Sequence, residues 1–102
     1  MADGLILEFD GFGIDTYERV NDALGIEMES GEGDWPDGLL SHTGAARDNG
    51  FVVFEVWRSQ ADQERFMNER LAAALQAGGV DGPPSRVEWL QLAAHHERPE
   101  QA

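Results

Sequence analysis

The segment from Phe51 to Trp57 constrains the fold more than any other part of the chain. It is rich in β-branched and aromatic residues, which favours a strand, and the side chains of a strand alternate between the two faces of its sheet. Because both alternating sets are apolar, this strand is predicted to lie in the middle of a sheet with both faces covered. The two sets are Val52, Phe54 and Val56 on one face, and Phe51, Val53 and Trp57 on the other.

A hairpin is predicted immediately before this strand. Asn49-Gly50 separates it from a second β-favouring segment, Leu39–Thr43. An Asn-Gly pair between two such segments is typical of a tight turn. The turn is expected at Arg47–Gly50, which makes the two strands antiparallel neighbours.

The remaining segments predict two helices and two outer strands, in the order β-α-β-β-α-β. This order is typical of a ferredoxin-like α+β fold, in which a four-stranded antiparallel sheet carries both helices on one face. The 102 residues form one domain, 1–102, with 95–102 as a polar tail. The predicted elements are strands Leu5–Phe9 and Arg86–Ala94, a helix of about Thr16–Leu24 with Asp15 and Glu18 as its capping box and Gly25 as its stop, and a helix that follows Ser59, with Asp62 completing its capping box, and stops at Gly78-Gly79.

The second face of the predicted sheet has no helix to cover it. The strands nevertheless carry large apolar residues on both faces, including Phe54 on the central strand and Leu90 on the last one. Monomeric proteins rarely expose such a patch. We therefore expect a homodimer in which two sheets pack face to face.

Charge and composition exclude several classes of function. With 20 Asp and Glu against 7 Lys and Arg, the net charge is −13, so neither nucleic acid nor a membrane surface is expected as a partner. The chain has no cysteine, and its basic residues are all arginine, which removes thiolate and lysine-based covalent catalysis. The absence of cysteine and of a signal-peptide pattern predicts a cytoplasmic protein.

Three segments resemble a known family: Gly38–Thr43, then Val56–Gln60 with Phe66 and Leu71, then Gly82-Pro83-Pro84. Over about residues 4–94 the chain is similar to the dimeric α+β barrel proteins of the antibiotic biosynthesis monooxygenase superfamily, particularly small actinobacterial members. The resemblance implies a ferredoxin-like protomer, a homodimeric barrel, and a pocket between sheet and helices.

The same superfamily contains haem-degrading enzymes, cyclases and cofactor-independent quinone-forming monooxygenases. Haem-degrading members carry a tryptophan in the second helix and a haem-ligating histidine near its end. The matching positions here are Phe66 and Gln76, so the haem ligand is missing and no cofactor is expected.

Three residues are candidates for acid-base catalysis. His42 lies within the strand before the hairpin, and imidazole is the commonest general base near neutral pH. Glu8 and Glu55 lie on two strands that should be adjacent, where a carboxylate needs a partner or is desolvated. The alternatives are a structural histidine that is hydrogen-bonded to a neighbouring backbone group or faces the dimer seam, and carboxylates that pair with arginine or face solvent.

Aromatic side chains are more numerous than a small core requires, and aromatic walls suit a flat ligand. The residues predicted to contact a small hydrophobic or aromatic ligand are Tyr17, Phe9, Phe54, Trp57, Phe66, Met67 and Trp89.

No metal site is predicted, because the acidic segment 27–34 lacks EF-hand spacing and His95 and His96 point to opposite sides of a strand.

With these candidate residues, the resemblance implies a cofactor-independent monooxygenase that acts on a small aromatic or polyketide-like substrate. His42 would generate an electron-rich anion in a dry pocket, and that anion would reduce dioxygen. Two alternatives remain open: a binding barrel without catalysis, and a cyclase or isomerase that uses proton transfer alone.

Overall fold

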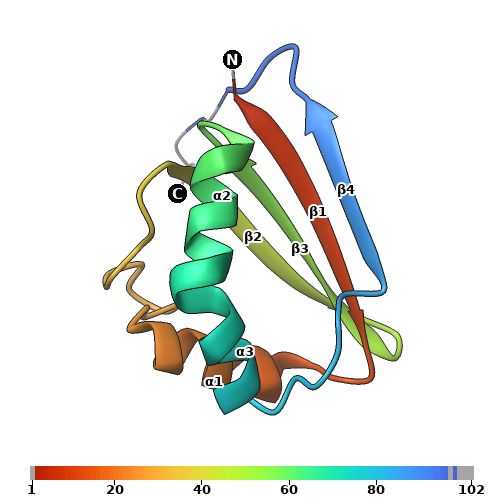
Figure 1. Cartoon of the computed structure of the whole chain (residues 1–102). Coiled ribbons are helices and arrows are strands. Elements are labelled where there is room, and N and C mark those ends of the chain that lie inside the picture. Colours follow the sequence, from red (N-terminus) through yellow and green to blue (C-terminus); the bar gives the residue numbers. More distant parts are fainter. Residues whose placement is uncertain (1, 97, 99–102) are drawn as a thin grey trace.

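The computed structural model describes residues 2–96 and 98. One antiparallel sheet has the strand order β2-β3-β1-β4, and the helices all lie on one of its faces (Figure 1). The predicted ferredoxin-like α+β fold is confirmed. Its elements are β1 (Asp3–Asp10), α1 (Ile14–Leu24), β2 (Leu39–Arg47), β3 (Gly50–Trp57), α2 (Gln60–Phe66), the π-helical segment η1 (Met67–Leu71), α3 (Ala72–Ala77) and β4 (Arg86–Gln91).

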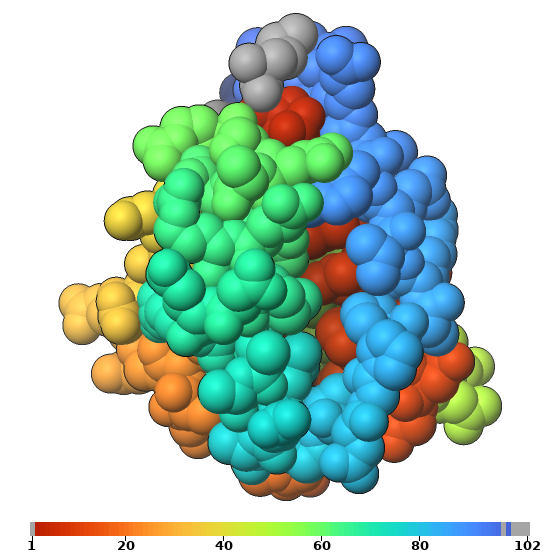
Figure 2. Space-filling view, in the orientation of Figure 1, coloured from red at the N-terminus to blue at the C-terminus, as the bar shows by residue number. Residues whose placement is uncertain are grey.

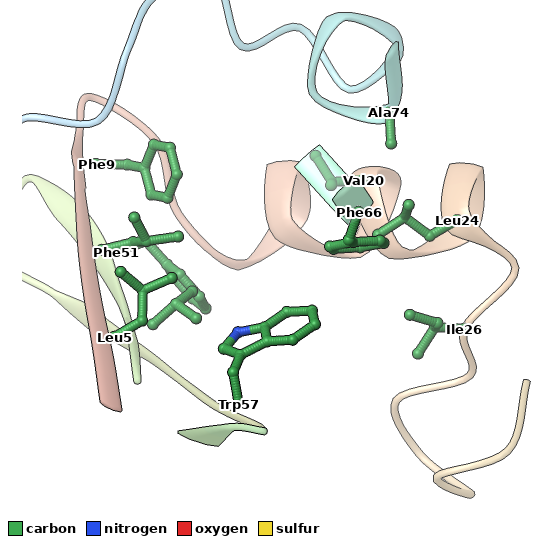
Figure 3. Close-up of a cluster of buried hydrophobic side chains, with 11 residues drawn as sticks. Leu5, Phe9, Val20, Leu24, Ile26, Phe51, Trp57, Phe66 and Ala74 are labelled. Atoms are coloured by element: carbon green, nitrogen blue, oxygen red, sulfur yellow. The ribbon is translucent and has the colours of Figure 1, made fainter. Parts of the chain in front are cut away.

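The core lies between the sheet and the helices. β3 is flanked by β2 and β1, which confirms its predicted central place. The indole of Trp57 is fully buried and lies 5.8 Å from the ring of Phe66, centroid to centroid (Figure 3). From the helix side, β1 remains visible between the helices and β4 (Figure 2). The buried residues of the core are Leu5, Leu7, Phe9, Val20, Leu24, Ile26, Phe51, Val53, Trp57, Phe66 and Ala74.

The β2–β3 hairpin forms as predicted but with a shorter turn. β2 continues to Arg47, which pairs with Gly50, so only Asp48 and Asn49 form the loop. Asn49 adopts the left-handed conformation, with φ of 61°, which asparagine tolerates better than most residues. Gly50 is required for a different reason: a Cβ at this position would lie 2.3 Å from the carbonyl oxygen of Phe9.

The predicted capping of the first helix was wrong. α1 begins at Ile14, and its N-cap is Gly13, which makes no side-chain hydrogen bond. Asp15 therefore lies inside the first turn, where its carboxylate still interacts favourably with the helix dipole. At the other end Gly25 has φ of 78° and terminates the helix as predicted.

The second helix begins as predicted, since the Ser59 hydroxyl accepts a hydrogen bond from the backbone N–H of Asp62 at 3.2 Å. It is not one regular helix, because η1 separates α2 from α3. Such π-helical turns are frequent at functional sites. Within η1, Arg70 donates hydrogen bonds to the carbonyl oxygens of Leu24 at 2.8 Å and Asp34 at 2.6 Å. It also lies 3.4 Å from the Asp34 carboxylate.

The last strand ends earlier than predicted, at Gln91 and not at Ala94. Gln91 pairs with Asp3, the first residue of β1, and the β1–β4 pairing ends there. Leu92 instead packs close to Gly4. The predicted polar tail, 95–102, lies partly outside the described residues. None of the helices in the described part of the chain is long and apolar enough to span a bilayer.

The face of the sheet opposite the helices is partly apolar. Ile6, Val52 and Leu90 are half-buried on this face, and Phe54 is 36% exposed. Glu8 lies among them. Its carboxylate is 3.2 Å from Nε of Arg47 and 3.0 Å from Nη1 of Arg86.

Candidate active site

A cavity of about 60 Å³ lies between α1, the sheet and the segment 26–39. This volume is smaller than the roughly 150 Å³ of a cavity that binds benzene, so a bicyclic ligand requires the walls to move apart. Four residues contribute polar groups: Tyr17, Asn21, His42 and Glu55. The other lining residues are Leu7, Phe9, Phe12, Val20, Leu24, Ile26, Trp35, Pro36, Leu39, Phe51, Val53, Phe66, Leu71 and Leu75.

Three of these polar residues and a core tryptophan form a continuous hydrogen-bond chain. The hydroxyl of Tyr17 bonds Nε2 of His42. Nδ1 of His42 lies 2.7 Å from Oε2 of Glu55, and Nε1 of Trp57 donates to Oε1 of Glu55 at 2.9 Å. Both oxygens of the Glu55 carboxylate are therefore held by neighbouring side chains.

Strand register explains why His42 and Glu55 meet. The two residues are direct cross-strand partners in the β2–β3 pair, and their side chains lie on the helix face. Trp57 follows Glu55 by two residues and so shares its face. Tyr17 comes from α1, and its ring packs on Phe51 with centroids 4.3 Å apart.

Gly44 makes room for the tyrosine. A Cβ at this position would lie 2.8 Å from both Cζ and the hydroxyl oxygen of Tyr17, which is closer than real Cβ contacts allow. Any side chain at Gly44 would therefore displace the phenol from His42. The hydrogen-bond chain can therefore form only because Gly44 has no side chain.

The hydrogen-bond chain fixes the orientation of the His42 imidazole. Because a carboxylate only accepts hydrogen bonds, the hydrogen of the neutral imidazole lies on Nδ1, facing Glu55. Nε2 is then the acceptor for the Tyr17 hydroxyl. The Tyr17 and His42 rings are tilted by only 3°, with centroids 5.9 Å apart, which fits an edge-to-edge hydrogen bond. The side chains of His42 and Glu55 are 11% and 9% exposed, so the pair is shielded from water.

Burial raises the pKa of Tyr17, and the negative charge of Glu55 raises it further. The nearby amide of Asn21 acts in the opposite direction and lowers it. The net result is a pKa above the ordinary value. Tyr17 therefore stays protonated at neutral pH and can both donate and accept a hydrogen bond at its oxygen.

The raised pKa can be measured directly, because Tyr17 is the only tyrosine in the sequence. We expect the near-ultraviolet absorbance of tyrosinate to appear with a midpoint above the ordinary value of about 10 in the folded protein, and at that value in urea. Since the folded state holds its proton more tightly, stability is retained below about pH 10 and lost as pH rises further. A folded-state midpoint at or below the urea value would contradict the burial of Tyr17.

The structure brings several of the predicted site residues together and separates others. His42, Glu55, Tyr17, Phe9 and Phe66 all line the cavity. His42 faces this cavity and not the opposite face of the sheet, where a dimer seam was considered.

The remaining predicted site residues do not line the cavity. Glu8 and Phe54 lie on the opposite face of the sheet, because they alternate with the buried residues of β1 and β3. Trp57 lies behind Glu55 and reaches the site only through that carboxylate. Met67 and Trp89 are half-buried outside the cavity lining.

The lining residues that the sequence analysis did not name as site residues include Phe12, Asn21 and Trp35. Asn21 had a readable signal, since it follows Tyr17 by four residues and so shares its helix face. Phe12 and Trp35 lie in irregular segments, where no periodicity indicates the direction of a side chain. Trp35, Pro36 and Phe66 also line a second, polar hollow of about 160 Å³ on the outer side of the cavity.

Metal-ligating side chains do not gather in the described residues. No group of three or more His, Asp or Glu side chains in this part of the chain is arranged to hold a metal ion.

Comparison with solved structures finds proteins with a similar fold. A protein from Chloroflexus aurantiacus J-10-fl, assigned as an antibiotic biosynthesis monooxygenase, superposes with a TM-score of 0.66. The match covers 95% of this chain and 98% of that one, at 14% identity. The chain has the fold of these proteins. No protein-family model and no curated protein sequence matches it.

A second similar structure is SnoaB, a cofactor-independent oxygenase from Streptomyces nogalater, at 19% identity and a TM-score of 0.51. The match covers 97% of this chain and 98% of SnoaB. A crystal structure of a SnoaB variant gives the same TM-score at 18% identity. The resemblance to antibiotic biosynthesis monooxygenases is therefore confirmed for the fold.

Proposed function

We propose that this protein is a cofactor-independent monooxygenase that acts on a small aromatic or polyketide-like substrate with an acidic hydroxyl or enol. The observation that carries the proposal is the His42–Glu55 pair, in which Nδ1 and Oε2 are 2.7 Å apart. Tyr17 is hydrogen-bonded to His42, and all three residues line a mostly apolar cavity. An oriented imidazole beside a buried carboxylate is a general base. The fold shared with SnoaB, a cofactor-independent oxygenase, supports the same reaction class.

The first step is a proton relay through Tyr17. The substrate hydroxyl gives its proton to the Tyr17 oxygen, while the Tyr17 proton passes to Nε2 of His42. The products are a substrate anion and an imidazolium. The imidazolium charge is balanced by the Glu55 carboxylate, whose second oxygen stays bonded to Trp57. The apolar walls keep the anion poorly solvated, which makes it a better reductant.

The second step is the reduction of dioxygen by that anion. One electron moves from the anion to dioxygen, and the substrate radical and superoxide combine at carbon to give a hydroperoxide after protonation. Loss of water from the hydroperoxide leaves a new carbonyl group. The overall reaction converts CH₂ and O₂ into C=O and H₂O, so dioxygen is the only oxidant needed.

Anthrone is a suitable probe because its enol is acidic and its oxidation product is a quinone. Purified protein at neutral pH should consume oxygen and form quinone well above the rate in buffer alone. An absence of oxygen uptake would contradict the oxygenase. Deuterium exchange into anthrone under argon, without oxygen uptake, would instead identify a proton-transfer enzyme. Binding without either reaction would identify a non-catalytic binding barrel.

We also propose that two copies assemble through the sheet face that carries Phe54. The half-buried apolar residues on that face support this assembly. Sedimentation equilibrium at micromolar concentration should give about twice the 11.2 kDa protomer mass. Phe54→Asp should give a folded monomer, whereas Val87→Asp, an exposed position on the other face of the sheet, should not. A folded wild-type monomer would rule out this assembly.

A further inference from the structure

Asn21 has a buried polar group with no partner. The residue is only 5% exposed, and it lines the cavity from α1. Among the buried side-chain nitrogen and oxygen atoms of residues 2–96 and 98, its Nδ2 alone has no hydrogen-bond partner. Buried donors in folded proteins are nearly always paired, so an unpaired one at a cavity wall requires an explanation.

The amide group lies next to the proposed proton relay. Asn21 follows Tyr17 by four residues in α1, so the two side chains are neighbours on one face of the helix. Both side chains line the cavity. The unpaired Nδ2 therefore lies on the same side of the cavity as Tyr17.

We propose that Nδ2 of Asn21 binds an oxygen atom of the ligand, which restricts the ligand to flat aromatic molecules that carry a carbonyl, phenol or enol oxygen. The proposal rests on the proposed function, because it places this oxygen where the relay begins. Apart from Asn21, Tyr17, His42 and Glu55, the cavity wall is apolar and would contact the hydrocarbon part of the ligand.

The same geometry makes Asn21 a stabiliser of the anion. After the relay, His42 donates to the Tyr17 oxygen, and the Tyr17 hydroxyl proton turns to the ligand oxygen. Asn21 then supplies the second donor to that oxygen. Hydrogen bonds strengthen when the acceptor becomes charged, so both donors favour the deprotonated ligand over the neutral one.

A binding experiment without oxygen separates this inference from the reaction. The probes are 2-naphthol and naphthalene, which differ only in the oxygen, and the readout is quenching of tryptophan fluorescence under argon. Asn21→Leu, which keeps the size of the side chain, should weaken 2-naphthol binding roughly tenfold or more and leave naphthalene within about twofold. Asn68→Leu, an exposed asparagine in η1, is the matched control and should change neither affinity.

Equal effects of Asn21→Leu on the two probes, or no effect on either, would overturn the assignment and indicate that Asn21 is a structural residue. The variant should also melt at a higher temperature than wild type, because an unpaired polar group is removed. Since no turnover is measured, a failed oxygen-uptake assay with intact naphthol selectivity would refute the proposed reaction and not the oxygen-binding role.

A second measurement uses the wild-type protein and needs no folded Asn21 variant. The carbonyl stretch of isotope-labelled 1-tetralone should shift to lower frequency on binding, relative to its value in an alkane solvent. The shift should persist in Tyr17→Phe, because Asn21 still donates. An unshifted carbonyl band in bound tetralone would refute the proposal.

Discussion

Replacing His42 by alanine should lower kcat/KM for oxygen uptake by about 10²- to 10⁴-fold, the usual contribution of a general base. The variant removes the only group that can take the proton from Tyr17 within the hydrogen-bond chain. Glu55→Gln should give a smaller loss, since the amide can still accept from His42 but carries no charge to balance the imidazolium. Initial rates with anthrone in an oxygen electrode measure both effects.

Glu8→Gln is a matched control for Glu55→Gln. Both carboxylates lie on adjacent central strands, yet Glu8 faces away from the cavity and pairs with Arg47 and Arg86. We expect Glu8→Gln to retain the wild-type rate of oxygen uptake. Equal rates for His42→Ala and wild type would eliminate His42 as the base. Equal losses for the two glutamine variants would show that global charge, and not the site, controls the rate.

Trp57→Ala should lower the free energy of unfolding by about 3–5 kcal/mol, as truncation of a buried aromatic residue usually does. Trp57 is fully buried, and its indole N–H bonds a carboxylate that is itself almost buried. The variant creates a cavity and also removes a donor from Glu55. Since small domains have a total stability of about 5–15 kcal/mol, this is a large fraction. Urea unfolding followed by circular dichroism measures it.

Trp57→Phe separates packing from hydrogen bonding at this position. Phenylalanine fills part of the space but cannot donate to Glu55, so its destabilisation should fall between wild type and Trp57→Ala. In this background Glu55→Gln should cost less than it does in wild type, because the carboxylate has already lost one partner. Strictly additive effects of the two substitutions would show that the indole N–H does not contribute to the hydrogen-bond chain.

The order of strands and helices could be predicted because it depends on local patterns. The two apolar faces of Phe51–Trp57 and the hairpin signal at Asn49-Gly50 identify β3 and its neighbour. The errors occurred where tertiary contacts decide the outcome. β4 ends where its pairing with β1 ends, and η1 interrupts a sequence whose helical periodicity is continuous. No single-sequence pattern signals either event.

The site was predicted only in part, for a geometric reason. His42 and Glu55 were correctly expected to lie on strands, but their pairing depends on strand register, which the sequence leaves open by one residue. For the same reason Glu8 was predicted as an acid-base candidate together with His42 and Glu55, although its side chain lies on the sheet face opposite the helices. Tyr17 was predicted as a ligand contact. Its bond to His42 also depends on the space above Gly44, which becomes visible only when α1 is placed on the sheet.

Arg70 links three segments that are far apart in the sequence. From η1 its guanidinium donates to the carbonyl oxygens of Leu24, at the end of α1, and Asp34, next to Trp35. Leu24 and Trp35 both line the cavity. A movement that widens the cavity by shifting either segment away from η1 therefore has to break a charge-assisted hydrogen bond of Arg70.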